Sequence, residues 1–316
     1  MAFLRGFGAW LPERVVTNEQ LAQRLGCQPD WIHNVSGIRE RRYAEETVTV
    51  ADLAVRAGED CLARTGADRS KIGMLMVASG SAERRFPGPA AEVARRLELT
   101  DRPAIDLPMA SAGSLFGMAL ASRLVDTWGD VLVIAAEKMS VFVDREPLDR
   151  NVAILFGDGA GACLVSGAAG PAKIVDSILR SDGAFTDALK LDFGGPLVMN
   201  GLSVILQAAR KLPKAIKELL ARNGIEPNAV QVYLLHQANQ NLIAKIASGM
   251  GVETASFYSN IERYGNTSSA SMLIAASEWA ASAGFGSAPL VFGGFGAGFH
   301  WGALLAEPVT PGAVSQ

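Results

Sequence analysis

Short runs of consecutive apolar residues, bounded by polar turns, recur along the chain. Four of these runs predict strands that are buried on both faces; they lie within residues 61–80 and 219–238 and at residues 131–137 and 289–295. In the first two segments a helical pattern precedes the strand and ends near a glycine, Gly66 or Gly224, which is typical of a left-handed helix cap. The pattern therefore predicts alternating helices and buried strands.

These segments repeat at a fixed spacing of 158 residues. Residues 61–80 align without a gap on residues 219–238, and residues 131–137 align on residues 289–295 at the same spacing. The helix-like stretch "SAGSLFGMALAS" falls on "SASMLIAASEWA" in this register as well. Three separate segments in one register indicate a duplication of the chain.

Each copy is typical of a doubly wound α/β unit. We expect two similar halves, residues 1–165 and residues 166–316, which pack as a pseudo-two-fold pair. The first half would carry a nucleophile, and the second would carry a histidine and an asparagine. Ligands bind such units at the carboxyl ends of the strands, so the site is predicted between the halves.

Composition narrows the class of protein. Hydrophobic residues make up 49% of the 316 residues, so the chain can bury a large core. The net charge of −3, with Lys and Arg spread through the chain, offers no basic field to nucleic acid. No apolar run is long enough to span a bilayer, and the N-terminus lacks the layout of a secretion signal. The three cysteines favour neither a disulfide framework nor a zinc site. We expect a cytoplasmic protein with no bound metal.

Three polar side chains follow predicted strands at their carboxyl ends. Ser111 ends a short apolar approach, "DLPMAS", just before a helix-like run. His236 comes directly after an apolar strand in "VYLLHQANQ", and Asn266 lies in a Gly-Asn turn before a helix start in "ERYGNTSSAS". Catalytic groups are commonly displayed where a loop meets a helix or strand, so we expect the three side chains to converge.

The motifs around these residues resemble those of the β-ketoacyl-acyl-carrier-protein synthase III family of the thiolase superfamily. "DLPMASAG", "HQAN" and "GNTSSAS" match its catalytic motifs in order and spacing, and "GIRERR", "FGDGAGA" and "GFGAGFHWG" match further landmarks. The resemblance covers essentially the whole chain. It implies an α/β thiolase fold with duplicated halves in five layers, α-β-α-β-α. It also implies an acyltransferase of fatty acid or polyketide biosynthesis that uses CoA thioesters as substrates and needs no cofactor.

The resemblance implies a role for each catalytic residue. Ser111 occupies the position at which the family usually has a nucleophilic cysteine. An alcohol needs a positioned base to lose its proton as it attacks, and His236 is the only plausible base. In the family, the pair that matches His236 and Asn266 donates hydrogen bonds to the malonyl thioester as carbon dioxide leaves. The backbone N–H groups of Ser111 and Gly298 would form the oxyanion hole.

The resemblance also implies contacts with substrates and with a second subunit. Trp31 and Arg150 match positions that sandwich the adenine of coenzyme A. Phe86 matches a phenylalanine that closes the acyl pocket of the other subunit, which implies a homodimer. The packing of Phe86 and Phe299, together with Leu197 and Ile205, would set the volume of the pocket.

Two residues depart from the family pattern. Val35, near the CoA nucleotide, and Asn241, at the carrier-protein docking surface, occupy positions where the best-known members have arginines. These departures indicate altered recognition of the acyl donor. Four basic residues on one predicted helix either offer a face to an acidic acyl carrier protein or are ordinary solvated charges; they are Arg210, Lys211, Lys214 and Lys217.

The serine leaves more than one function open. Transfer of an acyl group from a thioester to an alcohol is favourable, but the resulting oxygen ester resists attack by a carbanion. Ser111 is then a natural nucleophile, a deliberate replacement of cysteine, or the mark of an inactive member. The predicted function is transfer of an acyl group from acyl-CoA or acyl carrier protein to Ser111, followed by decarboxylative condensation with a malonyl thioester. The alternatives are an acyltransferase that forms no carbon–carbon bond and a non-catalytic partner subunit.

Overall fold

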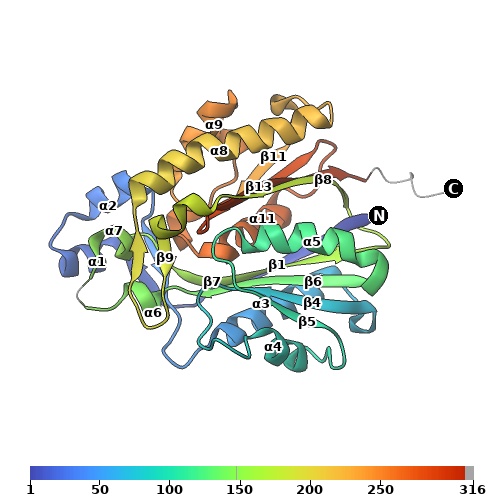
Figure 1. Cartoon of the computed structure of the whole chain (residues 1–316), viewed down its shortest axis with the longest axis horizontal. Helices are drawn as coiled ribbons and strands as arrows, with labels where there is room; N and C mark the ends of the chain where they lie inside the picture. Colours follow the sequence, from blue (N-terminus) through green and yellow to red (C-terminus); the bar gives the residue numbers. More distant parts are fainter. Residues whose placement is uncertain (147, 310–316) are drawn as a thin grey trace.

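A computed structural model describes residues 1–146 and 148–309. These residues form five layers of helices and strands (Figure 1). Helices cover both outer sides, and further helices lie in the middle between two groups of strands. The outer helices are α3 (Val50–Thr65), α4 (Ala90–Arg96), α8 (Gly201–Arg222) and α9 (Gln240–Met250), and the middle helices are α5 (Gly113–Trp128) and α11 (Ser271–Ser282). The expected α-β-α-β-α order is present.

Within the described part of the chain, the two groups of strands belong to a nine-stranded mixed sheet whose order is mirrored about its centre. The order is β5-β4-β6-β7-β1 in the first group and β8-β13-β12-β11 in the second. β4 pairs in parallel with β5 and β6, and β11 pairs in parallel with β12, whereas the other neighbours are antiparallel. The strands are β1 (Ala2–Trp10), β4 (Ile72–Ala78), β5 (Ala104–Leu107), β6 (Asp130–Lys138), β7 (Asp158–Ser166), β8 (Ala172–Ser181), β11 (Val232–Leu235), β12 (Leu290–Gly296) and β13 (His300–Pro308).

The repeated segments form matching elements. β4 and β11, β6 and β12, and α5 and α11 are the three pairs that the spacing of 158 residues relates, and both strand pairs hold equivalent places in the mirrored order. Gly66 and Gly224, at the ends of α3 and α8, have φ values of +56° and +68°, so the predicted left-handed caps are confirmed. The division of the chain at residue 165 stays a prediction.

Shorter elements gather at one end of the layers. Helices α1, α2, α6 and α7 and strand β9 lie together there, on the left in Figure 1. The short elements are β2 (Val15–Thr17), α1 (Asn18–Leu25), α2 (Pro29–Ser36), β3 (Glu40–Arg42), α6 (Ser140–Val143), α7 (Arg150–Ala153), β9 (Leu189–Leu191), β10 (Leu197–Met199) and α10 (Ile261–Tyr264).

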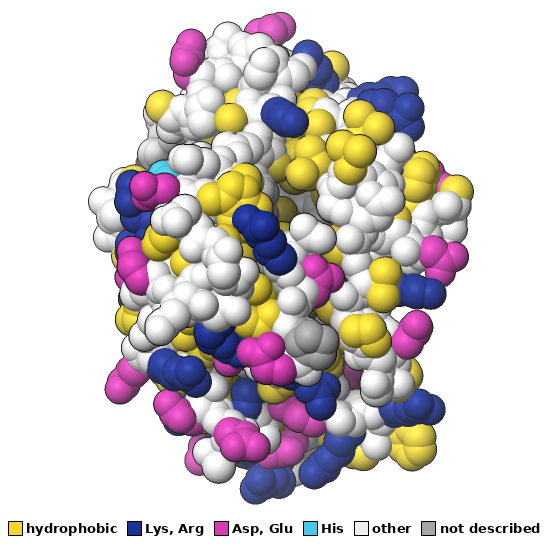
Figure 2. Space-filling model, turned by 90° about the vertical axis from the view of Figure 1, so that its left-hand side faces the viewer, with side chains coloured by type: hydrophobic (Ala, Val, Ile, Leu, Met, Phe, Trp, Pro, Cys, Tyr) yellow, Lys and Arg dark blue, Asp and Glu magenta, His cyan; other side chains and the backbone are white. Residues whose placement is uncertain are grey.

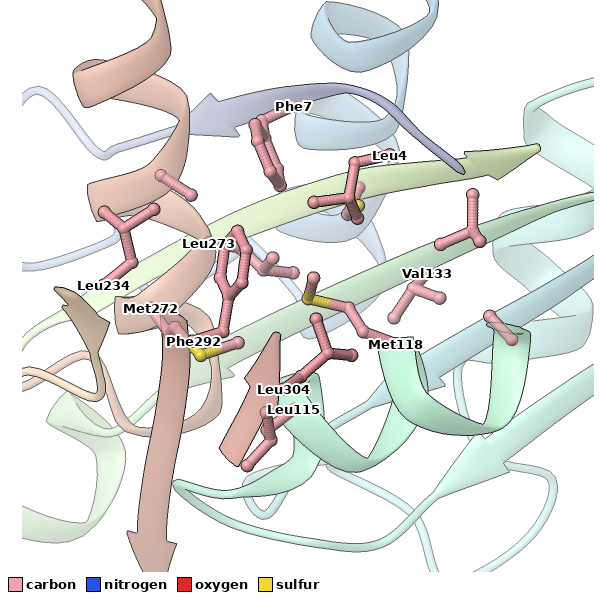
Figure 3. Packing of buried hydrophobic residues seen from close by; sticks show 14 of the residues in the cluster. Leu4, Phe7, Leu115, Met118, Val133, Leu234, Met272, Leu273, Phe292 and Leu304 are labelled. Carbon is pink, nitrogen blue, oxygen red and sulfur yellow. The ribbon is translucent and has the colours of Figure 1, made fainter. Parts of the chain in front are cut away.

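The largest cluster of buried side chains joins the two halves across the middle layer. Leu115 and Met118 of α5 and Met272 and Leu273 of α11 belong to it, together with residues from β1, β6, β11, β12 and β13 (Figure 3). Burial of this apolar surface stabilises the fold by roughly 25 cal/mol for each Å² removed from water. The middle helices therefore fix the position of each half relative to the other.

The packing of α11 on β7 depends on a glycine. A Cβ at Gly161 would lie 2.6 Å from the Cβ of Leu273 and 2.8 Å from the backbone nitrogen of Ile274. We predict that Gly161→Ala lowers the free energy of unfolding by roughly 1–3 kcal/mol, because α11 must move away from the sheet. Gly183→Ala is the control, since a Cβ there meets no atom within 4 Å. Urea unfolding of both variants measures the difference, and equal midpoints would contradict this account.

Candidate active site

Ser111 lies on a tight turn between β5 and α5. Its φ is +60°, in the left-handed region that a non-glycine residue occupies only at a cost in energy. Such strain persists where the surrounding structure fixes the backbone, and it is common at functional sites. Ser111 is 7% exposed and lies next to the N-terminal end of α5, which begins at Gly113.

Two glycines allow neighbouring segments to approach this turn closely. A Cβ at Gly296 would lie 2.7 Å from the Cβ of Ser111 and 2.7 Å from the carbonyl oxygen of Ala110. A Cβ at Gly113 would lie 2.9 Å from the Cβ of Ala78, at the end of β4. Larger residues at either position would displace the turn that carries Ser111.

His236 follows β11, and its ring is held through Nδ1. Nδ1 lies 2.6 Å from the hydroxyl oxygen of Ser271. This oxygen also accepts a hydrogen bond from the N–H of Gln237 at 3.0 Å, and the hydroxyl donates to the carbonyl of Ser268 at 3.0 Å. Burial lowers the pKa of His236 from its usual 6.5 to about 4, so the imidazole is neutral at physiological pH.

The same contacts bear on which ring nitrogen carries the proton. When the Ser271 hydroxyl donates to the carbonyl of Ser268, its oxygen accepts from the Nδ1–H of His236. In that tautomer, Nε2 of His236 carries a lone pair and can accept a proton.

Asn266 is fixed by its backbone and by its side-chain oxygen. Its N–H donates to the carbonyl of Leu155 at 2.9 Å, and its carbonyl accepts from the N–H of Gly157 at 3.0 Å. Its Oδ1 accepts from the N–H of Ser268 at 2.9 Å. Since the amide oxygen is engaged, Nδ2 is the end of the side chain that can donate to a bound molecule.

One pocket brings the three predicted catalytic residues together. Ser111, His236 and Asn266 all line it, and apolar side chains make up most of the remaining wall. Figure 2 shows a hollow bordered by hydrophobic side chains on the face that carries α1, α2 and α7. An apolar pocket with a few converging polar groups suits an organic substrate that reacts at one end. The apolar lining includes Phe156, Met199, Ile205, Leu242, Ile246 and Phe295.

The two predicted oxyanion donors are in different surroundings. The N–H of Ser111 donates to Ser268 Oγ at 3.1 Å, so this donor already has a partner. Gly298 does not line the pocket that Ser111, His236 and Asn266 share. A Cβ at Gly298 would lie 2.4 Å from the His300 ring. Gly296 is the glycine of this loop that lines the pocket beside Ser111. The assignment of the oxyanion hole stays a prediction.

The predicted adenine-binding pair is in contact. The Arg150 guanidinium carbon lies 3.8 Å from the centroid of the Trp31 ring, a cation–π contact. Neutral hydrogen bonds link α2 to the start of α9 nearby, where Asn241 Nδ2 donates to the carbonyl of Asn34 at 3.0 Å. Val35, the other departure from the family pattern, is 38% exposed. These two positions therefore present an apolar side chain and an amide rather than positive charge.

The remaining predicted contact residues differ in exposure. Phe86 is 85% exposed, whereas Phe299 is fully buried and packs on Phe295, with ring centroids 4.8 Å apart. Phe295 lines the pocket, so Phe299 influences its shape from behind. Leu197 is buried in a cluster with Phe156, which also lines the pocket.

The basic residues of α8 divide into two groups. Arg210, Lys214 and Lys217 are exposed, while Lys211 is half-buried and forms an ion pair with Asp182 at 2.5 Å. Three of the four side chains therefore remain available to an acidic partner.

Neither a metal site nor a membrane-spanning helix is found in the described residues. Across residues 1–146 and 148–309, no group of three or more His, Cys, Asp or Glu side chains is placed to hold a metal ion. In the same ranges, no helix has both the length and the hydrophobicity needed to cross a lipid bilayer.

Sequence reasoning missed the residues that support the three predicted catalytic residues. Ser268 accepts a hydrogen bond from the N–H of Ser111 and donates its own N–H to Asn266 Oδ1. Ser271 contacts the ring of His236. Glu137 is a fully buried carboxylate that accepts hydrogen bonds from Ser268 and its neighbour. A charged residue in a run as apolar as "DVLVIAAEK" is a signal that could have found it, because buried charges require partners.

The layered, mirrored fold is thiolase-like, and solved structures match it closely. The 3-oxoacyl-[acyl-carrier-protein] synthase III of Aquifex aeolicus VF5 aligns with a TM-score of 0.92 and 29% identity, over 97% of this chain and 100% of that chain. The corresponding synthase of Pseudomonas aeruginosa PAO1 aligns with a TM-score of 0.91 and 29% identity, over 98% of each chain. The predicted fold class is confirmed.

Sequence comparison identifies the family. Residues 105–183 match the family model for 3-oxoacyl-[acyl-carrier-protein] synthase III, and residues 220–307 match the model for its C-terminal part. The β-ketoacyl-[acyl-carrier-protein] synthase III of Nitratidesulfovibrio vulgaris (strain DP4) is 34% identical over 96% of this chain and 98% of the relative. The chain therefore belongs to the 3-oxoacyl-[acyl-carrier-protein] synthase III family of the thiolase superfamily. The prediction of an acyltransferase of this type is confirmed at the level of the family.

The low pKa of His236 predicts a pH dependence of stability. The unfolded chain binds a proton at His236 below about pH 6.5, whereas the folded protein binds one only near pH 4. Stability is therefore lost as the pH falls from about 6.5 to about 4, by roughly 3 kcal/mol at most. We expect His236→Gln to remove this component.

Urea unfolding of both proteins from pH 7 to pH 4 measures it. The variant serves as the reference, because the carboxylates titrate equally in both proteins. A difference in stability that does not change with pH would contradict the buried, neutral imidazole.

Proposed function

We propose that the protein transfers an acyl group from a thioester to Ser111 and then condenses it with a malonyl thioester by decarboxylation. The observation that carries this proposal is the meeting of Ser111, His236 and Asn266 on the wall of one apolar pocket. The donors would be acyl-CoA or acyl carrier protein, and the product a β-ketoacyl thioester. Relatives named β-ketoacyl-[acyl-carrier-protein] synthase III support the class of reaction.

In the first step Ser111 Oγ attacks the thioester carbonyl carbon. His236 Nε2, which carries a lone pair, takes the hydroxyl proton as the new C–O bond forms. Collapse of the tetrahedral intermediate breaks the C–S bond, and the protonated histidine returns its proton to the leaving thiolate. The step leaves an acyl ester on Ser111 and a neutral imidazole, as the low pKa of His236 favours.

In the second step a malonyl thioester loses carbon dioxide. The electron pair of the broken C–C bond becomes an enolate, whose oxygen would accept a hydrogen bond from Asn266 Nδ2. The enolate carbon attacks the ester carbonyl and forms the new C–C bond, and Ser111 Oγ leaves and recovers a proton from solvent through His236. The hydrogen bond to Asn266 Oδ1 supports this role, because it orients the amide for donation.

The serine makes the second step the slower one. An oxygen ester is less reactive toward carbon nucleophiles than a thioester, so acylated protein would accumulate. An alcohol or amine as the second substrate would give an acyltransferase that forms no C–C bond. The retained Asn266 favours condensation, because transfer to an alcohol or amine does not need a group that stabilises an enolate.

Partner recognition would use the surface around the pocket. The stacked Trp31 and Arg150 offer flat faces to an adenine ring if the donor is a CoA thioester. Arg210, Lys214 and Lys217 offer exposed positive charge to an acidic carrier protein. Val35 and Asn241 add no charge to this surface, which favours weak recognition of phosphate groups there.

A homodimer is part of the proposal. β5 is an edge strand, and such a strand presents unpaired backbone groups that a second chain can pair with. Ile105 on this strand is 40% exposed, and the nearby loop exposes Phe86. Pairing of two β5 strands would cover these apolar side chains.

The central test is acylation followed by intact-protein mass. We expect wild-type protein to gain one acyl group from a panel of acyl-CoAs and Ser111→Ala to gain none. His236→Ala should slow acylation by roughly 10²–10⁴-fold, as loss of a general base does. Asn266→Ala should keep acylation but lose malonyl decarboxylation by roughly 10²–10³-fold. Asn260→Ala is its control, because Asn260 is also buried but hydrogen-bonds to Glu278 outside the pocket.

Four outcomes separate the alternatives. Decarboxylation without a β-ketoacyl product would replace condensation by simple acyl transfer. No mass gain with any thioester would leave a non-catalytic partner subunit. A large gain in condensation by Ser111→Cys would identify an attenuated cysteine enzyme, whereas a loss would identify a genuine serine acyltransferase.

The dimer has its own test. We expect Ile105→Glu to convert a dimer into a monomer in sedimentation velocity, because the charge would be buried without a partner. Val175→Glu is the control, since Val175 is similarly exposed, at 36%, on β8. A wild-type protein that sediments as a monomer at micromolar concentration would rule out the proposed interface.

A further inference from the structure

Glu137 is a buried carboxylate at the centre of the polar contacts behind the pocket. It lies near the end of β6 and is fully buried. Two segments far apart in the sequence donate hydrogen bonds to its carboxylate, residues 79–81 and residues 268–269. The donors are the N–H groups of Gly80 and Ser269 and the hydroxyls of Ser79, Ser81, Ser268 and Ser269.

An ionised carboxylate only accepts hydrogen bonds, so it fixes the direction of each neighbouring hydroxyl. The Ser268 hydroxyl donates to Glu137 Oε1 at 3.0 Å and therefore has only lone pairs left for other partners. It uses one of them to accept the N–H of Ser111 at 3.1 Å. A chain of two hydrogen bonds thus runs from the nucleophile's backbone through Ser268 to Glu137.

Ser268 is also the residue that holds the other two catalytic side chains. Its N–H donates to Asn266 Oδ1, and its carbonyl accepts the hydroxyl proton of Ser271, whose oxygen accepts from His236. The φ of Ser268 is +48°, a strained value that needs support from neighbouring groups. Glu137 supplies such support, since it binds the hydroxyl of Ser268 and both donors of Ser269.

We propose that Glu137 is a positioning residue that sets the hydrogen-bond directions of the whole site through Ser268. The proposal rests on the proposed function, because it assigns the supports of that reaction. Glu137 touches neither substrate nor the reacting atoms. It acts by holding the turn at Ser268, which fixes the amide of Asn266, the lone pair on His236 Nε2 and the strained backbone of Ser111.

Two substitutions and one control separate a positioning role of Glu137 from a role in stability alone. Ser268→Ala removes the link between Glu137 and Ser111 but keeps the backbone groups that bind Asn266 and Ser271. Ser140→Ala is the matched control, because the buried Ser140 hydroxyl also donates to a buried carboxylate, Asp158, at 2.6 Å. Glu137→Gln keeps the shape of the side chain and removes its charge.

We expect Ser268→Ala to lower the rate constant of Ser111 acylation by about 10- to 100-fold, the size of effect that misplacement of a reacting group produces. KM for the thioester and the rate of malonyl decarboxylation should stay within a few-fold of wild type. Glu137→Gln should lower both half-reactions, whereas Ser140→Ala should lower neither. The backbone amide proton of Ser111, observed by NMR, should shift upfield in Ser268→Ala and move in Glu137→Gln.

Two results would overturn the proposed role of Glu137. Acylation by Ser268→Ala at the rate of Ser140→Ala overturns the proposal, as does an unchanged Ser111 amide signal in Glu137→Gln. If Glu137→Gln does not fold, the two serine variants still decide. If wild-type protein takes no acyl group from any thioester, the proposed function fails, and the Ser111 amide signal alone decides whether the hydrogen-bond chain exists.

Discussion

The close packing of α5 and α11 is the constraint on which the rest of the structure depends. α5 carries Ser111 at its N-terminal end, and α11 follows the turn that carries Asn266 and Ser268. The two ends are in contact at Gly113, where a Cβ would lie 3.5 Å from the Cβ of Ser269. The apolar cluster shared by both helices makes this arrangement part of the core, so the geometry of the site is held by the same burial that stabilises the fold.

The site combines a serine with an environment that suits a neutral base. Burial keeps His236 uncharged, and the contacts of Ser271 are compatible with a proton on Nδ1. A neutral imidazole with a free Nε2 can activate an alcohol, which unlike a thiol does not ionise readily at a helix N-terminus. The polar groups behind the pocket therefore suit a base that activates the serine at position 111.

Much of the fold could be predicted, because buried strands and their repeat leave a clear pattern in the sequence. The segments spaced by 158 residues became matching strands and middle helices. The convergence of Ser111, His236 and Asn266 followed from their places after strands. Glu137 and Ser268 were missed because they bind each other across 131 residues of sequence. The contact between Trp31 and Arg150 and the burial of Phe299 behind Phe295 likewise depend on side-chain packing that no periodicity encodes.

The proposed reaction requires the Ser111 hydroxyl to be the acyl acceptor. Tandem mass spectrometry of peptides from protein briefly exposed to an acyl thioester tests this role. We expect an acyl group on the peptide that contains Ser111, held by an oxygen ester that resists neutral hydroxylamine. A label on Cys27, Cys61 or Cys163 that neutral hydroxylamine removes, or no label at all, would contradict it.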